Sequence, residues 1–125
     1  FKALKILSSE GIKVNLTLAF SATQVLQAMR MGAYYVSPFI GWKESNAEAV
    51  FDFVQEIVAI RDNYSFSTQI LVAAVRNGRQ IADAAVTGAD IVTAGFTVFQ
   101  ESFEHPYTTM GLGRFQSFWD KTPYE

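Results

Sequence analysis

Two polar residues, Asn15 and Thr17, interrupt the apolar run Val14-Asn-Leu-Thr-Leu-Ala-Phe20 near the start of the chain. Side chains two residues apart in a β-strand point to the same side, so a carboxamide and a hydroxyl would face one space. If that space is the interior of a barrel, the pair can hydrogen-bond a polar ligand. The competing explanation is that each side chain satisfies neighbouring backbone groups, as buried polar groups usually do.

A second candidate site is an anion-binding segment, where Arg76-Asn77-Gly78 follows the apolar run 69–75. A guanidinium beside a helix N-terminus suits an anion, because backbone N–H groups and the helix dipole add to its charge. Thr93-Ala94-Gly95 ends the next apolar run, and barrels often bind phosphate between the loops of their last two strands. The alternative for Arg76 is a solvated surface side chain.

A third candidate is Ser37-Pro38-Phe39, where Pro38 stops a strand and leaves Ser37 and Phe39 at its rim. A plain strand stop would explain the same residues. Active-site residues of parallel α/β barrels lie at the carboxyl ends of the strands. Taking residues at those ends gives one set of candidates: Asn15, Thr17, Ser37, Phe39, Trp42, Ala74, Arg76, Thr93 and Gly95.

The sequence offers few residues for thiolate, histidine, paired-carboxylate or lysine chemistry. The chain has no cysteine, and its one histidine, His105, lies beside Pro106 in a predicted loop. No carboxylate pair falls at a strand end, since Asp90 would lie at the amino end of its strand. We therefore expect no metal and no cofactor. The five lysines occupy predicted helices, loops or strand starts, where nothing would desolvate an amine for Schiff-base chemistry: Lys2, Lys5, Lys13, Lys43 and Lys121.

Strands that alternate with helices must position these candidates. Short apolar runs predict strands at 13–19, 34–38, 69–75 and 90–94, with helices in every gap. One helix is predicted from Ala47 to Arg61, capped by Ser45 or Asn46, with a short helix at 96–103. A break at His105-Pro106 precedes a last helix, which is predicted from Thr108 or Thr109 to Asp120. Such alternation indicates a parallel sheet covered by helices, in an open or a barrel form.

An internal repeat favours the barrel. Segment 24–37 resembles segment 80–93, and in each a helix, a Gly-Ala stop and a buried strand follow one another. Gly32 and Gly88 fall where a helix needs a left-handed residue after its end, a conformation that glycine adopts at low cost.

Composition narrows the class of protein further. Of the 125 residues, 50% are hydrophobic and 18% are charged, with a net charge of −2. The chain can bury a core, but a complete (β/α)8 barrel needs about 200 residues or more. No basic stripe or long apolar run is present, so we expect no nucleic-acid partner, no membrane span and a soluble, cytoplasmic location. The start at Phe1 rather than Met is consistent with a fragment of a longer protein.

Three segments carry a resemblance to the transaldolase family and its small-aldolase branch: Asn15-Leu-Thr-Leu-Ala-Phe-Ser21, Tyr35-Val-Ser-Pro-Phe-Ile-Gly41 and His105-Pro-Tyr-Thr-Thr-Met-Gly-Leu-Gly-Arg-Phe115. The resemblance runs from Phe1 to about Lys121. It implies a (β/α)8 TIM barrel, of which residues 1–125 form a single partial domain with strands five to eight and the closing helix. It also implies a Schiff-base lysine upstream of Phe1, and a homo-oligomer. The fructose-6-phosphate aldolase branch differs, because it has Tyr where Phe39 stands and lacks Asn at position 15.

The resemblance also implies roles for single residues. Asn15 and Ser37 would hydrogen-bond the hydroxyls of a bound dihydroxyacetone unit, and Thr17 would hold the catalytic water. Phe39 would wall the pocket, and Arg76 would bind the terminal anion of the sugar.

Two residues depart from the family pattern. Trp42 stands where the family usually has Arg, and Ala74 where it has Ser, both of which normally hold the substrate phosphate. Losing a cation and a hydroxyl weakens a dianion site, whereas an indole offers one N–H and a flat apolar wall. At this site the chain resembles transaldolases that act on 6-deoxy-6-sulfofructose.

We therefore expect part of a transaldolase whose donor is a sugar phosphate or a sulfonated sugar. Three alternatives stay open. One is a fructose-6-phosphate aldolase-like enzyme, and another is a non-catalytic half-barrel with a structural or oligomeric role. The third is a different phosphate-binding barrel, such as an isomerase.

Overall fold

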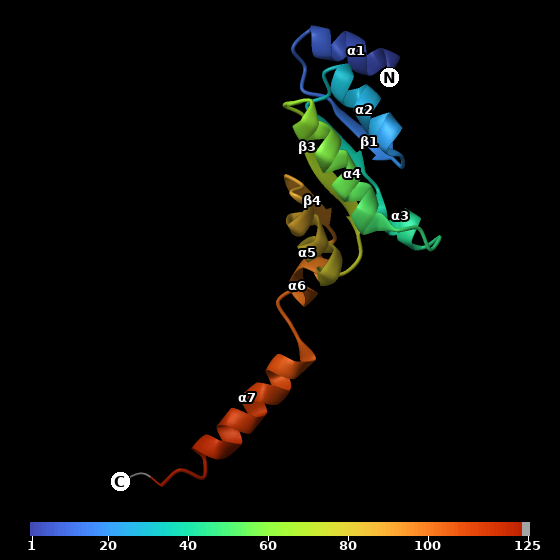
Figure 1. Cartoon of the computed structure of the whole chain (residues 1–125). Coiled ribbons are helices and arrows are strands. Elements are labelled where there is room, and N and C mark those ends of the chain that lie inside the picture. The colour runs from blue at the N-terminus through green and yellow to red at the C-terminus, as the bar shows by residue number, and fades with distance from the viewer. Residues whose placement is uncertain (124–125) are drawn as a thin grey trace.

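The structure is a computed structural model that describes residues 1–123. Helices and strands alternate along the chain (Figure 1), and their bounds are as follows: α1 Lys2–Ser9, β1 Asn15–Ala19, α2 Ala22–Arg30, β2 Tyr35–Pro38, α3 Ile40–Glu44, α4 Val50–Asn63, β3 Gln69–Val75, α5 Gly78–Thr87, β4 Ile91–Ala94, α6 Phe96–Glu101 and α7 Pro106–Trp119. The predicted strands are confirmed, each within two residues at its ends.

The four strands form one parallel sheet in the order β1-β2-β3-β4. Tyr35 pairs with Asn15 on one side and with Gln69 on the other, and Val36 pairs with Leu16 and Ile70. The protein is thus α/β, with four parallel strands alternating with helices, as the sequence predicts.

One face of this sheet holds the core. Val36, Ile70 and Val72 are fully buried there, among side chains of the helices that cover this side in Figure 1: Val25, Ala28 and Met29 of α2, Phe53, Val54, Ile57 and Val58 of α4, and Ala84 of α5. Because side chains alternate along a strand, Asn15, Thr17 and Ser37 belong to the opposite face. Asn15 and Thr17 are exposed on that face.

The two copies of the internal repeat also share the way in which their helices begin and end. Gly32 and Gly88 follow their helices with the same left-handed φ of +84°, which confirms the prediction for both glycines. At the other end of these helices, Ser21 caps α2 and Asn77 caps α5, each side chain accepting a hydrogen bond from the backbone N–H of a glutamine three residues on.

The strand that precedes each copy of the repeat is also irregular. The register of β1 shifts between Leu16 and Ala19, and that of β3 shifts between Val72 and Val75. Within these irregularities Leu18 and Ala74 have positive φ values of 57° and 59°, a conformation that non-glycine residues adopt rarely. The bulges redirect the chain just before the two helices begin.

The sequence prediction is wrong at one connection. Helix α3 was not expected, and α4 begins at Val50 with Ala49 as a cap that makes no side-chain bond. The predicted caps belong to α3 instead: Ser45 Oγ donates to the carbonyl of Gly41 at 2.8 Å, and Asn46 Nδ2 donates to the carbonyl of Trp42 at 2.8 Å. Side chains that bond backward end one helix and cannot cap the next.

The last helix, α7, begins earlier than predicted, whereas α4 begins later. Pro106 is the first residue of α7, which the fixed φ of proline favours. His105 Nδ1 accepts a hydrogen bond from the N–H of Tyr107 at 3.1 Å and so caps α7. The helix stands away from the rest of the molecule in Figure 1, and its apolar side chains are exposed: Tyr107, Met110, Leu112, Phe115, Phe118 and Trp119. Within residues 1–123 no helix is both long and apolar enough to cross a bilayer.

Asp90 ties three elements together at the amino end of the sheet. Its Oδ2 accepts from the N–H of Ile70 at 2.8 Å and from Arg61 Nη1 at 2.6 Å. Arg61 also donates to Asp62 and to the carbonyl of Gly88. The bond to Asp62, with the charge of Asp90, raises the pKa of Arg61 in spite of its partial burial. The predicted position of Asp90 on the structural end of the sheet is confirmed.

We predict that Asp90→Ala destabilises a protein containing this chain by about 1–3 kcal/mol, because the N–H of Ile70 and the guanidinium of Arg61 both lose an acceptor. Urea unfolding measures the loss. Asp62→Ala is the matched control, since Asp62 is exposed and also contacts Arg61, and we expect it to cost less than about 1 kcal/mol. Equal losses for the two variants would contradict the structural role of Asp90.

Candidate active site at the carboxyl edge of the sheet

Asn15 and Ser37 form a polar pair across β1 and β2. Ser37 Oγ donates to Asn15 Oδ1 at 2.9 Å, and Ser37 is 2% exposed. Asn15 opens β1 rather than ending it, so its predicted place at the carboxyl end of the strand is wrong. Its side chain is nevertheless held by Ser37, which fixes the direction of its amide. Among residues 1–123 the Nδ2 donors of Asn15 have no protein acceptor, so they are available to a ligand.

Thr17 lies two residues further along the same face and is exposed. The structure gives its hydroxyl no partner within residues 1–123. Within residues 1–123 neither the Asn15 nor the Thr17 side chain hydrogen-bonds to neighbouring backbone, which was the competing explanation for the pair.

Three aromatic rings lie beside these groups and form an aromatic corner, defined here as Phe20, Phe39 and Trp42. The Phe20 and Trp42 rings stack with centroids 5.7 Å apart, and Phe39 meets Trp42 edge-on at 5.9 Å. Phe39 bridges to Ala73 of β3, so the corner sits where β1, β2 and β3 end. Trp42 is 53% exposed, which leaves part of the indole open to a ligand. Phe20 was not predicted as a site residue, although its place directly after β1 was the available signal.

Arg76 lies directly after β3, one residue before the cap of α5, as expected for a cation beside a helix N-terminus. Its Nη1 donates to Ser45 Oγ of the α3 end, and its backbone N–H donates to Gln80 Oε1 at 2.7 Å. Within residues 1–123 it has no ion-pair partner, whereas Arg61 and Arg79 are paired with carboxylates. The charge of Arg76 thus stays available to an anion.

Ala74 is the residue that forms the bulge at the end of β3, with φ +59°. Thr93 is exposed in the adjacent β4, and Gly95 is the residue before α6. Thr93 lines a hollow beside α6 with Ile81, Val92, Ala94, Phe96 and Phe99. The hollow is mainly apolar, so its lining does not make an anion site around Thr93.

The remaining polar candidates have structural partners. Lys43 Nζ donates to the carbonyl of Phe20 at 3.1 Å, pairs with Glu48 and lies 4.8 Å from the centre of the Phe53 ring. Lys13 lies over the Tyr34 ring, and His105 caps α7. Residues 1–123 contain no cluster of His, Cys, Asp or Glu that could hold a metal.

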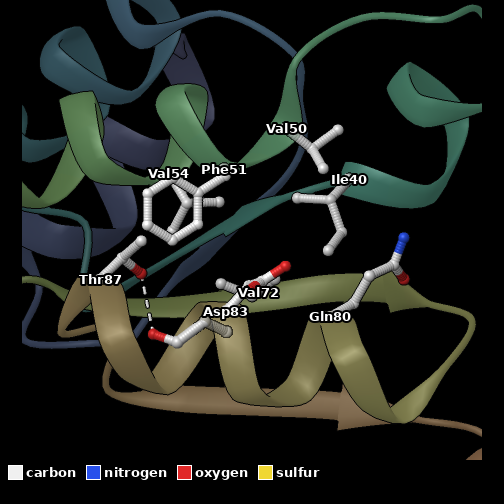
Figure 2. A pocket seen from close by; sticks show the side chains of 9 residues that line it. Ile40, Val50, Phe51, Val54, Val72, Gln80, Asp83 and Thr87 are labelled. Atoms are coloured by element: carbon white, nitrogen blue, oxygen red, sulfur yellow. Dashed lines mark hydrogen bonds between the residues drawn. The ribbon is translucent and has the colours of Figure 1, made fainter.

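A small pocket lies on the helix-covered side of the sheet, among α3, α4, α5 and β3 (Figure 2). Its lining is mainly apolar and consists of Ile40, Val50, Phe51, Val54, Val72, Gln80, Asp83, Ala84 and Thr87. The hydroxyl of Thr87 is turned back to the carbonyl of Ala84 at 2.8 Å. The pocket is therefore a packing gap behind the sheet, separate from the polar groups on the open face.

Comparison with known proteins gives a family match over nearly the whole chain. The family model described as Transaldolase/Fructose-6-phosphate aldolase matches residues 1–122. A 6-deoxy-6-sulfo-D-fructose transaldolase of Priestia aryabhattai is 50% identical over 123 residues, which are 98% of this chain and 54% of the relative. A probable transaldolase of Dictyoglomus turgidum is 46% identical over 122 residues, 98% of this chain and 57% of the relative. The chain thus spans about half the length of the curated relatives it matches.

Solved structures with low sequence identity share the fold. A mandelate oxidase variant superimposes with a TM-score of 0.54 at 18% identity, covering 75% of this chain and 29% of the other. A second mandelate oxidase variant gives 0.56 at 19% identity, covering 75% of this chain and 28% of the other. This likeness is a partial, TIM-barrel-like match.

Proposed function

Because the chain belongs to the transaldolase/fructose-6-phosphate aldolase family, we propose that it is part of a transaldolase that transfers a dihydroxyacetone unit to an aldose phosphate. The donor is a ketose with an anionic tail, either 6-deoxy-6-sulfofructose or fructose 6-phosphate. Similarity to a 6-deoxy-6-sulfo-D-fructose transaldolase over 98% of the chain supports the first donor. The whole enzyme is longer, since its relatives are about twice this length.

The observation that carries the proposal is the Asn15–Ser37 pair on the uncovered face of the sheet. The 2.9 Å bond between the two side chains orients the Asn15 amide. Its free N–H donors can then bind the hydroxyls of a three-carbon ketose unit, and Ser37, which is buried, contributes by holding that amide. Thr17 holds the water that moves protons, and Phe39 walls the pocket.

The reaction uses a lysine that lies outside residues 1–125. Its amine adds to the ketose carbonyl and expels water, which gives a Schiff base. The carbon 4 hydroxyl loses its proton as the bond between carbons 3 and 4 breaks, and the aldehyde leaves. The retained enamine adds to the acceptor aldehyde, whose oxygen takes up a proton, and water then hydrolyses the new Schiff base to release the product and the lysine. None of the five lysines of this chain is suited to this role, because Lys43 is ion-paired and none lies within a strand.

The tail of the donor is bound at the end of β3. Arg76 supplies one positive charge that no carboxylate of residues 1–123 neutralises. Trp42 supplies an aromatic wall and one N–H, and Ala74 adds no hydroxyl. One cation with an indole suits a monoanionic sulfonate better than a dianionic phosphate.

The four strands form strands five to eight of a (β/α)8 barrel, and residues 1–125 are a partial domain of it. The open face with Asn15, Thr17 and Ser37 then faces the barrel interior. The exposed apolar residues of α7 pack on another subunit of a homo-oligomer. No nucleic acid, membrane or cofactor takes part.

The first test concerns the Schiff base. We predict that borohydride with fructose 6-phosphate traps a covalent adduct in the full-length protein on a lysine outside residues 1–125. The isolated chain should trap nothing, because its lysines lack a desolvated position on a strand. Mass spectrometry of the digested protein locates the adduct. A stable adduct on any of the five lysines of this chain would overturn this assignment.

The second test concerns the donor tail. We predict that Trp42→Arg in the full-length enzyme improves kcat/KM for fructose 6-phosphate relative to the sulfonated analogue by about tenfold, the value of one charge-assisted hydrogen bond of roughly 1.5 kcal/mol. Trp42→Leu is the control, since it removes the indole without adding charge. Arg76→Ala should damage both donors. If Trp42→Arg leaves the ratio of kcat/KM for the two donors unchanged, the proposed role of Trp42 is wrong.

The third test concerns assembly. We predict that the full-length protein is a homo-oligomer and that Phe115→Glu lowers its mass, because a charge cannot be buried in an apolar interface. Ser117→Glu, in the same helix, places the same charge on a polar residue and should leave the mass unchanged. Light scattering measures both variants. A monomeric wild-type protein would refute the proposal.

A further inference from the structure

We propose that Ser45 is a positioning residue for Arg76, and that it holds the guanidinium without neutralising its charge. The inference rests on the proposed function of Arg76 as the group that binds the donor tail. Ser45 lies at the end of α3, on a different segment of the chain, and its Oγ accepts a hydrogen bond from Arg76 Nη1.

The space for this contact comes from Gly41. A Cβ placed on Gly41 would lie 2.1 Å from the carbonyl oxygen of Ala74 and 2.8 Å from Arg76 Nε. Contacts so short do not occur, so no other residue at position 41 allows α3 to approach the end of β3 this closely. The Cδ and Nε atoms of Arg76 therefore lie directly against the backbone of α3 at Gly41.

The hydroxyl of Ser45 is oriented for this task. It donates its single proton to the carbonyl of Gly41 at 2.8 Å. Because a hydroxyl has one donor and two lone pairs, its remaining capacity is that of an acceptor, which an arginine N–H requires. The hydroxyl thus links the guanidinium to the backbone of α3 in a fixed direction.

The backbone of Arg76 is linked to the same helix, α3, through Gln80 of α5. Its N–H donates to Gln80 Oε1 at 2.7 Å, and Gln80 Nε2 donates to Glu44, the neighbour of Ser45. Gln80 is 3% exposed, so this amide is a buried link. Glu44, the last residue of α3, and Ser45, which follows it, therefore fix both ends of Arg76, the first through Gln80 and the second directly.

The neutral character of Ser45 is what makes it suited to a ligand site. Arg61 and Arg79 are also fixed in direction, but each is held by a carboxylate. A carboxylate at position 45 would hold Arg76 more tightly and would compete with the tail of the donor. A hydroxyl leaves the full charge and the remaining N–H groups of Arg76 for the ligand.

Steady-state kinetics of the full-length enzyme test this with fructose 6-phosphate and with fructose, which lacks the anionic tail. Ser45→Ala should raise KM for fructose 6-phosphate by about tenfold, a typical value for one hydrogen bond to a charged group, with kcat nearly unchanged. Ser45→Thr should restore the low KM, because it keeps the hydroxyl. Ser45→Asp should raise KM for fructose 6-phosphate further, although it retains Arg76. None of these variants should change kcat/KM for fructose by more than about twofold.

Ser9→Ala is the matched control, because Ser9 Oγ also donates to a backbone carbonyl at a helix end, that of Ile6 at 2.7 Å. It should leave KM for both donors unchanged. The positioning role is overturned if Ser45→Ala leaves KM for fructose 6-phosphate unchanged, or if it weakens both donors equally. A wild-type enzyme without activity on fructose 6-phosphate, on 6-deoxy-6-sulfofructose and on fructose would refute the proposed function instead. Inorganic sulfate affinity, measured by calorimetry, then decides the positioning role, and equal affinity of the wild type and Ser45→Ala overturns it.

Discussion

The carboxyl edge of the sheet depends on the contact between α3 and the end of β3, where the backbone of Gly41 meets the carbonyl of Ala74. Even a methyl group at position 41 would lie 2.1 Å from that oxygen. The approach brings Ser45 to the Arg76 side chain and Glu44 to Gln80. It also sets Trp42, the next residue of α3, against Phe20 and Phe39. One residue without a side chain thus joins the aromatic corner to the cation.

The two copies of the internal repeat share one backbone arrangement but place different side chains at the carboxyl edge of the sheet. Before each copy a bulged strand leads to the capped helix, and the glutamine that opens the copy accepts, through its side chain, the backbone N–H of the residue after that strand. That residue is Phe20 before the first copy, with a 2.8 Å bond to Gln24, and Arg76 before the second, with a 2.7 Å bond to Gln80. Since the glutamine holds only the backbone, the side chain at this place is free to be an aromatic ring or a cation.

The distribution of apolar residues leaves two surfaces that the described chain does not cover. Helices bury one face of the sheet, while Asn15 and Thr17 are exposed on the other. Helix α7 exposes Phe115 and Phe118 at 71% and 67%. A polar sheet face suits a cavity that binds a sugar, whereas an apolar helix suits burial against protein. The two surfaces therefore support different proposals, a barrel interior for the first and a subunit contact for the second.

The sequence by itself determined the features that follow from local patterns. Apolar runs located the four strands, Gly32 and Gly88 located two helix ends, and the isolated polar residues Asn15, Ser37 and Arg76 marked the candidate site. These signals lie within a few residues of the structure they specify. The tertiary structure decided the rest: the bond between Asn15 and Ser37, the helix α3, and the contact of Ser45 with Arg76. Ser45 had the features of a helix cap in sequence, and its bond to Gly41 is local. Its acceptance of an arginine N–H depends on a close approach of two distant segments, which no local pattern encodes.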